Sequence, residues 1–278
     1  MLVYLNGEFL PHEEARLPVD DRGFLFADGV YEVVRVHDGR PFLFREHLDR
    51  LADGLAALRI AFDGTARLAE VGERLIEENA LRSGDATIYI QLTRGAAPRK
   101  HAFPPEGTPP TVYVAAKAFT QHPGCYFTEG VGAITVPDTR WARCDIKSTA
   151  LLPNVLANQQ AKEAGAFEAL FVRDGVVVEG SHSNLFAVVD DVLVTYPRCN
   201  YILPGITRQR LLDLAAEFGI AAREAPLFAD RLGGVQELFL AGTTTDVMPV
   251  TRVDGRPIGT GAPGPITQRL LEAYRALM

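Results

Sequence analysis

The alternation of apolar and polar residues divides this chain into short strands and amphipathic helices. Four Asx-Gly pairs separate β-branched runs, and each is the two-residue turn that a tight antiparallel hairpin requires. These pairs are Asn6-Gly7, Asp38-Gly39, Asp174-Gly175 and Asp254-Gly255. Apolar residues also recur at helical spacing, at Leu48, Leu51, Leu55 and Leu58, at Leu68, Val71 and Leu75, and at Leu211, Leu212, Ala215 and Phe218. The pattern predicts an α+β fold with mostly antiparallel sheets and flanking helices.

The order of these segments predicts two domains. The first half contains hairpins, two helices and strands at 87–93 and 111–117, after which 118–124 loses its periodicity. The second half is richer in strands, at 169–172, 176–179 and 185–189, and finishes with a helix near 266–277. We predict a smaller N-terminal domain at 1–118, a linker at 119–124 and a larger C-terminal domain at 125–278. We expect the active site between the domains, because ligand sites favour such positions.

Composition and charge exclude several classes of function. A chain of 278 residues with 47% hydrophobic and 23% charged residues is an ordinary folded protein. Its net charge of -7 argues against nucleic-acid binding, which needs a basic surface. The sequence shows neither a signal peptide nor a membrane span, and its three cysteines are too few and too scattered for a disulfide framework or a zinc site. We therefore expect a cytoplasmic protein without a metal, a nucleic-acid partner or a membrane partner.

Lysine is rare in this chain, which has four lysines and 24 arginines (28 − 4). Lys147 differs from the other three because it lies in RCDIKSTALLPN, between an aspartate and two hydroxyl residues, where an extended segment gives way to a helix. A partly buried lysine with a lowered pKa can attack a carbonyl carbon and form a Schiff base, which an arginine cannot do. Taken alone, such a lysine is more often structural or solvent-facing.

An acid follows at a distance of 32 residues (179 − 147). Glu179 ends the apolar run VVVE, just before Gly180 and a polar cluster. A carboxylate there can stabilise a cationic ring nitrogen such as that of pyridoxal phosphate, which serves as an electron sink only while it is protonated. The alternative is a glutamate that closes a hairpin at the surface.

A turn before a helix is a candidate site for an anion. In LPGITR the backbone N-H groups of Ile206 and Thr207 open the helix, and a helix N-terminus favours negative charge. Arg50 and the threonine run that begins at Thr243 can add donors. The alternatives are a threonine that caps its own helix, a solvated arginine and an ordinary loop.

A basic loop is a candidate site for a carboxylate. Arg99 and His101 stand two residues apart in TRGAAPRKHAFPP, so an extended loop directs both side chains to the same side. Arginine matches a carboxylate with its planar fork, and an imidazole adds a second donor. Tyr31 can add a phenolic hydrogen bond. A solvent-exposed loop is the alternative.

The chain resembles the fold type IV pyridoxal-phosphate enzymes and, within them, the D-amino acid aminotransferases, also called D-alanine aminotransferases. The similarity runs nearly end to end and keeps the family's order and spacing. It is carried by DRGFLFADGVYEVVRV, FREHLDRL, LTRGAAPRKHAFP, DIKSTALLPNVLANQQAKEAG, VVEGSHSNLF, ILPGITRQRLL and TTTDVMPV.

The resemblance implies a cofactor, a reaction and a role for each candidate residue. Lys147 is implied as the Schiff-base lysine and proton shuttle for pyridoxal 5'-phosphate, and Glu179 as the partner of the ring nitrogen. The implied phosphate ligands are Arg50, Ile206, Thr207 and Thr243, and the implied ligands of the substrate α-carboxylate are Tyr31, Arg99 and His101. The implied reaction is ping-pong transamination between a D-amino acid, such as D-alanine or D-glutamate, and a 2-oxo acid, pyruvate or 2-oxoglutarate. A homodimer is also implied, because in the family the loop with Arg99 and His101 reaches the neighbouring subunit.

Two departures and several alternatives remain. His182 stands where these enzymes often have serine, and Pro204 where a longer polar side chain is usual. The same fold type includes branched-chain L-aminotransferases, (R)-amine transaminases and aminodeoxychorismate lyase. The Arg99 and His101 pair favours the D-amino acid reaction among these. A non-catalytic binding protein on the same scaffold would have no use for both a proton-shuttling lysine and a carboxylate site.

Overall fold

The computed structural model describes residues 1–278 and groups them into two units. Unit 1 consists of Met1–Gln121 and Ile146–Leu151, and unit 2 of His122–Asp145 and Leu152–Met278. The predicted domain limits placed Lys147 in the second domain, whereas its contacts group it with unit 1. The reason is local, since Ile146 lies in the apolar core of unit 1 and Ser148 pairs with Val30 in an antiparallel bridge.

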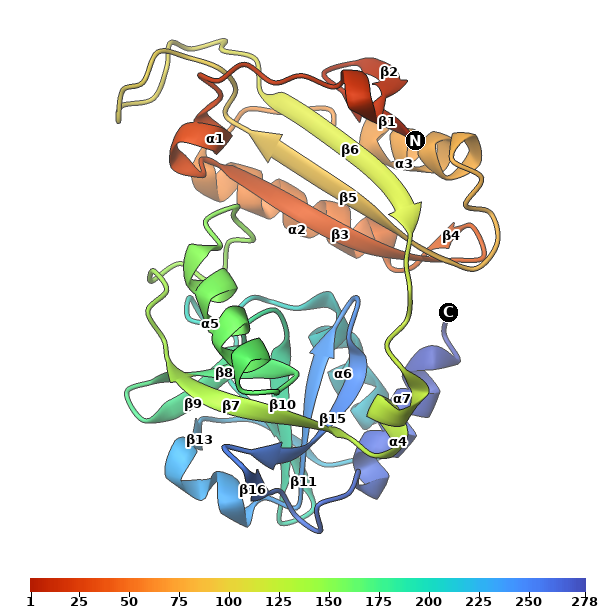
Figure 1. Ribbon diagram of the computed structural model, residues 1–278, viewed down its shortest axis with the longest axis vertical. Coiled ribbons are helices and arrows are strands. Elements are labelled where there is room, and N and C mark those ends of the chain that lie inside the picture. The colour runs from red at the N-terminus through yellow and green to blue at the C-terminus, as the bar shows by residue number, and fades with distance from the viewer. The chain divides into compact units, whose positions relative to one another are not determined.

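Unit 1 is built on a six-stranded sheet in the order β2-β1-β6-β5-β3-β4, in which every pairing is antiparallel (Figure 1). Its strands are β1 (Leu2–Leu5), β2 (Glu8–Pro11), β3 (Gly29–His37), β4 (Arg40–Pro41), β5 (Asp85–Thr93) and β6 (Thr111–Ala118). Its helices are η1 (His12–Glu14), α1 (Arg22–Phe26), α2 (Phe44–Leu58) and α3 (Arg67–Glu78). Leu51 of α2 and Leu75 of α3 share one buried cluster with Ile88 and Ile90 of β5. The leucine spacing that predicted α2 and α3 is therefore the spacing of their core-facing sides.

Unit 2 is built on a ten-stranded sheet in the order β12-β11-β10-β14-β15-β7-β8-β9-β13, with β16 beside β15. Its strands are β7 (Val131–Pro137), β8 (Glu168–Arg173), β9 (Val176–Gly180), β10 (Asn184–Val189), β11 (Val192–Thr195), β12 (Ala222–Glu224), β13 (Leu227–Phe228), β14 (Glu237–Gly242), β15 (Asp246–Val253) and β16 (Arg256–Pro257). Its helices are α4 (Gly124–Thr128), α5 (Leu152–Glu163), α6 (Ile206–Glu217), η2 (Ala229–Gly234) and α7 (Pro265–Arg275).

Three pairings in unit 2 are parallel, namely β7 with β8, β15 with β7 and β11 with β12. Parallel neighbours need a long crossover, and the connection from β7 to β8 contains both the segment with Lys147 and helix α5 (Figure 1). The remaining pairings are antiparallel, so the predicted α+β class with mostly antiparallel sheets is confirmed. No helix has the length and apolar character that crossing a membrane would require.

The four predicted Asx-Gly turns all join adjacent antiparallel strands, β1–β2, β3–β4, β8–β9 and β15–β16. Each has both central residues at positive φ. A fifth tight turn joins β10 to β11 through Asp190 and Asp191, at φ 50° and 60°. It lacks glycine and so escaped the Asx-Gly pattern, although aspartate tolerates this conformation better than most residues do.

Candidate active site

Lys147 is fixed to the start of strand β3 in unit 1. The Tyr31 backbone N-H donates to the Lys147 carbonyl at 3.0 Å, and the Thr149 N-H donates to the Gly29 carbonyl at 3.0 Å. The Lys147 ammonium lies 4.4 Å from the centroid of the Tyr31 ring, where the ring face attracts a cation. The lysine is half-buried and its backbone is held on both sides, so its amine has a defined place beside Tyr31.

Glu32, the residue after Tyr31, is fully buried between two basic side chains of α2. Arg50 donates from Nε to Oε1 at 2.7 Å and from Nη2 to Oε2 at 2.8 Å, and His47 Nδ1 lies 2.7 Å from Oε2. Burial by itself would raise the pKa of Glu32, but Arg50 and His47 outweigh it and hold the pKa at about 2. Burial lowers the pKa of His47, and the nearby charges of Arg50 and Lys147 add to that effect against the opposing pull of Glu32. Arg50 is thus part of a buried network and not a solvated helix residue.

Sequence reasoning missed Glu32 and His47, although a signal for each exists. Strand residues two apart face the same side, so Glu32 is in phase with the buried Val30 and Val34. A carboxylate in that phase needs a buried partner. His47 and Arg50 are three residues apart on α2 and therefore share one helix face.

Arg99 and His101 are exposed, and both lie against Phe26. The Arg99 guanidinium carbon is 5.0 Å from the Phe26 ring centroid, and the imidazole of His101 is 5.5 Å from it. The loop backbone between them is held from inside, since the buried Arg22 donates from Nη1 to the Lys100 carbonyl at 2.6 Å. The two basic side chains thus stand together on the surface of unit 1.

Glu179 ends strand β9 in unit 2 and is buried. Its Oε1 accepts from Arg140 Nη1, and its Oε2 accepts from Asn184 Nδ2 at 3.0 Å and from the Leu203 N-H at 3.1 Å. Burial raises the pKa of Glu179 to about 7, while Arg140 and the Leu203 N-H oppose that rise. The surface alternative for this glutamate is therefore excluded.

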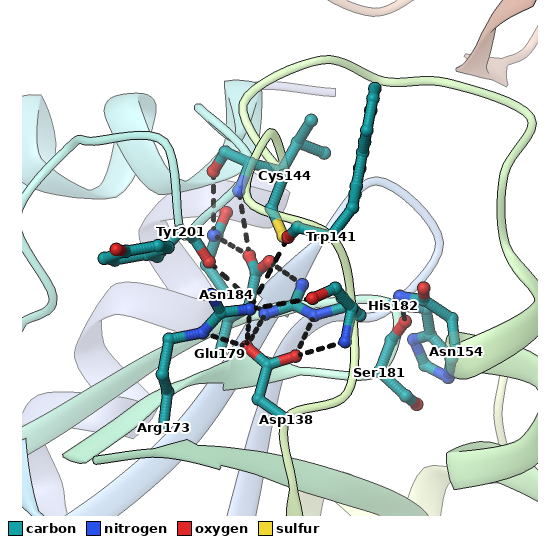
Figure 2. A network of polar contacts seen from close by, with 12 residues as sticks. Asp138, Trp141, Cys144, Asn154, Arg173, Glu179, Ser181, His182, Asn184 and Tyr201 are labelled. Carbon is teal, nitrogen blue, oxygen red and sulfur yellow. Dashed lines mark hydrogen bonds and ion pairs between the residues drawn. The ribbon is translucent and has the colours of Figure 1, made fainter.

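Figure 2 shows that Glu179 shares its surroundings with a second carboxylate, Asp138. Arg140 lies between them and donates from Nε and Nη2 to the two oxygens of Asp138, both at 2.9 Å. Arg173 donates to the same aspartate from Nε at 3.0 Å. Asp138 and Arg140 come from the loop after β7, a DTR sequence that looks like an ordinary solvated turn, so the sequence offered no signal for them.

Helix α6 begins at Ile206, and its N-cap is Gly205, which has no side chain to cap the first turn. The first N-H groups of a helix have no partner within it, and this turn contains no acidic residue. The hydroxyl of Thr207 lies 3.1 Å from that of Tyr274, so it is not the cap. An uncapped helix N-terminus without an acid has the backbone N-H groups that an anion requires.

Asn184 ties this turn to Glu179. Its Nδ2 donates to Glu179 Oε2 and to the Leu203 carbonyl, each at 3.0 Å. A side-chain carbon at Gly205 would collide with the Asn184 side-chain oxygen, which explains the glycine. The carboxylate and the helix N-terminus therefore keep a fixed separation within unit 2.

Two further predicted positions lie in tight turns of unit 2. Thr243 is half-buried between β14 and β15, in a turn closed by the Thr245 N-H and the Gly242 carbonyl at 3.1 Å. His182 follows Glu179 in the loop before β10, and its backbone N-H donates to the buried Glu168 at 2.7 Å. Its Nδ1 lies 3.3 Å from the same carboxyl group, so the histidine that departs from the expected serine has an acidic neighbour.

A family model described as amino-transferase class IV matches residues 29–253 of this chain. The chain belongs to the class IV aminotransferases. It is 42% identical to the D-alanine aminotransferase of Bacillus licheniformis over an alignment of 277 residues, and this alignment covers 99% of this chain and 96% of the relative. It is 39% identical to the D-alanine aminotransferase of Staphylococcus aureus strain N315, which covers 98% of this chain and 96% of that one.

Solved structures agree with this assignment. The branched-chain amino acid aminotransferase of Escherichia coli matches this class IV aminotransferase with a TM-score of 0.91 at 29% identity, covering 99% of this chain and 93% of that one. A hypothetical aminotransferase from Mycobacterium tuberculosis, solved in its PLP-bound form, matches with a TM-score of 0.85 at 25% identity, over 100% of this chain and 98% of that one.

The groups present in this class IV aminotransferase fit a pyridoxal 5'-phosphate. Unit 2 contains the uncapped N-terminus of α6, whose N-H groups suit a phosphate. It also contains the buried Glu179 carboxylate, which suits a ring nitrogen, and Asn184 holds the two at a fixed separation. Unit 1 offers the amine of Lys147, whose backbone is held beside Tyr31.

Proposed function

We propose that this chain is a pyridoxal 5'-phosphate-dependent aminotransferase that exchanges an amino group between a D-amino acid and a 2-oxo acid by a ping-pong mechanism. The observation that carries the proposal is its full-length identity of 42% to a D-alanine aminotransferase, against 29% to a branched-chain enzyme of the same fold. D-Alanine with pyruvate and D-glutamate with 2-oxoglutarate are the proposed substrate pairs.

The cofactor, when bound, supplies an electron sink that stabilises negative charge at the substrate α-carbon. In the proposal Lys147 would hold the cofactor through its amine, and the same amine would move the substrate α-proton as a general base and acid. The backbone of Lys147 is anchored for this role, because its carbonyl accepts the Tyr31 N-H. Glu179 accepts a hydrogen bond from the ring nitrogen and stabilises its protonated form.

The proposed phosphate ligands are Arg50, the backbone N-H groups of Ile206 and Thr207, and Thr243. Arg50 is oriented for any such contact by the two bonds that its Nε and Nη2 make to Glu32. The uncapped first turn of α6 supports the assignment of Ile206 and Thr207.

Tyr31, Arg99 and His101 are the proposed ligands of the substrate α-carboxylate. Because Arg99 and His101 are exposed on unit 1, we assign them to the site of a neighbouring subunit in a homodimer. The start of α5 supports an assembly, since Leu152, Val155 and Leu156 are 68%, 59% and 56% exposed. We place the reaction in the cytoplasm, where the three free cysteines would stay reduced.

The stereochemical half-reaction tests the substrate. The purified protein, loaded with pyridoxal 5'-phosphate, is mixed separately with D-alanine and L-alanine, and the visible absorbance of the bound cofactor and the release of pyruvate are followed. Conversion by D-alanine alone, abolished in Lys147→Ala, is the expected result. Conversion by L-amino acids would replace this proposal with a branched-chain aminotransferase, which the E. coli structural match makes the second candidate.

Mixed dimers test the assignment of Arg99 and His101. Lys147→Ala and Arg99→Ala chains are co-expressed with different tags, and the heterodimer is purified. If the loop serves the neighbouring subunit, one of its two sites regains both residues, and activity returns to about half of the wild-type value, because a dimer has two equivalent sites. A heterodimer as inactive as its parents would show that the loop serves its own subunit, and a monomer in solution would exclude the dimer.

A further inference from the structure

One arginine in unit 2 is shared unequally between two buried carboxylates. Asp138 receives Nε and Nη2 of Arg140, and its Oδ1 also accepts the Arg140 backbone N-H at 3.0 Å. Glu179 receives only Nη1 of that guanidinium. Arg140 is thus fixed to Asp138 by its fork and meets Glu179 by its remaining nitrogen.

The hold on Arg140 is reinforced from three further sides. Its guanidinium carbon lies 4.2 Å from the centroid of the Phe171 ring, and its Nη2 also donates to the Tyr201 carbonyl at 3.3 Å. Arg173 binds both Asp138 and the Arg140 carbonyl, the latter at 3.2 Å. The Asp138 side chain is itself fully buried. Arg140 therefore cannot turn its fork toward Glu179 unless it leaves Asp138.

The other oxygen of Glu179 contacts no cation. Its Oε2 accepts from an amide side chain, that of Asn184, and from the Leu203 N-H. Neutral donors stabilise a carboxylate less than a bidentate arginine does. The charge of ionised Glu179 is thus less compensated by neighbouring cations than that of a carboxylate held by both nitrogens of an arginine fork, and this oxygen stays open to a further cation.

We propose that Asp138 is a positioning residue for the cofactor. Asp138 holds the fork of Arg140 away from Glu179 and so keeps the Glu179 carboxylate available to the ring nitrogen. The inference rests on the proposed function. When Asp138 loses its charge, Arg140 is released and pairs with Glu179 through two nitrogens, and this second nitrogen competes with the ring nitrogen for the carboxylate.

The test compares two ligands that differ at a single ring atom. Pyridoxal 5'-phosphate and 1-deazapyridoxal 5'-phosphate have the same aldehyde and phosphate, but the second has a C-H in place of the ring nitrogen. Binding of each to the cofactor-free protein is measured at equilibrium. In Asp138→Asn the affinity for pyridoxal 5'-phosphate should fall about tenfold, the value of one pKa unit, and that for the deaza analogue should change by less than about twofold.

A matched control lies in unit 1. Asp85 also accepts an arginine, Arg35 Nη2 at 2.8 Å, and is mostly buried, but it belongs to a different unit from Glu179. Asp85→Asn should leave the ratio of the two affinities at its wild-type value. A similar loss in Asp85→Asn would show that the ratio reports general destabilisation, and would overturn the inference.

A second variant keeps the inference testable if Asp138→Asn does not fold. Arg140→Gln removes the cation itself, so the ratio of the affinity for pyridoxal 5'-phosphate to that for the deaza analogue should be at least as large as in the wild type. Adding Asp138→Asn to this variant should not change the ratio further. A reduced preference in Arg140→Gln, or a further loss in the double variant, would show that Asp138 does not act through Arg140.

The outcomes separate the inference from the function on which it rests. If Asp138→Asn loses the same affinity for both ligands, or loses none, the role of Asp138 is overturned while the proposed function stands. A wild-type protein that binds neither ligand overturns the proposed function and the inference with it.

Discussion

The two units each bury a glutamate against an arginine, with opposite results. In unit 1 Glu32 takes two nitrogens of Arg50 and one of His47, and its pKa lies at about 2. In unit 2 Glu179 takes one nitrogen of Arg140, and burial raises its pKa to about 7.

The difference shows that an adjacent arginine does not by itself decide the charge of a buried carboxylate. Both glutamates pay a desolvation cost, and what separates them is how many arginine nitrogens face each one and whether another acid competes for that arginine. Asp138 is that competitor in unit 2. The Glu32 network is a closed ion pair suited to holding structure, whereas Glu179 keeps the capacity to accept another cation.

Replacing the open carboxylate should have the largest effect on activity. Glu179→Gln removes the charge that stabilises a protonated ring nitrogen, and we expect transamination with D-alanine to slow by about 10²- to 10³-fold, as for the loss of one electrostatic contact in an active site. The measurement is kcat at saturating D-alanine and pyruvate with the cofactor fully loaded. Glu163→Gln, on the exposed side of α5, is the control. Wild-type kcat in Glu179→Gln would remove this residue from the chemistry.

Replacing the closed carboxylate should instead affect stability. The folded pKa of Glu32 lies below its ordinary value of 4.5, so its stabilisation is present above pH 4.5 and is lost as the pH falls toward 2. The difference of 2.5 pH units (4.5 − 2) corresponds to about 3 kcal/mol. Urea unfolding of the cofactor-free protein at pH 7 and pH 3 should show about 2 kcal/mol of this loss in the wild type. Glu32→Gln should be less stable at pH 7 and should lack this part of the acid dependence, while the exposed Glu46→Gln should retain it. Equal acid dependence in all three proteins would contradict the assigned charge state.

Glu179 should give a pH dependence of the opposite sign, and no larger. Its folded pKa lies above the ordinary value of 4.5, so its contribution to stability is present below pH 4.5 and is lost as the pH rises through 7. The cofactor-free wild type should therefore lose up to about 3 kcal/mol from this group between pH 4.5 and pH 8. Glu179→Gln should not show that loss. Unfolding measured at half-unit intervals tests the sign, and a wild type whose stability relative to the variant rises with pH would invert the comparison.

The features that could be predicted from the sequence are those that depend on neighbouring residues in the chain. The Asx-Gly pairs specify their own turns, and the leucine spacing specifies the buried sides of α2 and α3, so both were found without knowledge of the rest of the fold. Lys147, Glu179 and the start of α6 were singled out because each lies in a short segment with unusual chemistry, and their roles toward the cofactor remain proposals.

The supporting charges were missed because their partners are far apart in the sequence. Arg140 meets Glu179 39 residues away, and Arg173 meets Asp138 35 residues away. The short sequence DTR does not indicate that its charged residues make such distant contacts. The grouping of Lys147 with unit 1 has the same origin, since it depends on strand β3, more than a hundred residues earlier.

The smallest effect should come from a pair with the geometry of a closed ion pair but without burial. Arg143 gives Nε and Nη2 to the two oxygens of Asp145, both at 2.9 Å, as Arg50 does to Glu32, yet its side chain is 49% exposed. Water and salt screen such a pair, and ordering two side chains offsets what attraction remains. Arg143→Gln should therefore leave the midpoint of urea unfolding unchanged at pH 7, at low salt and at high salt alike. A destabilisation comparable with that of Glu32→Gln would mean that bidentate geometry, and not burial, gives the Glu32 network its strength.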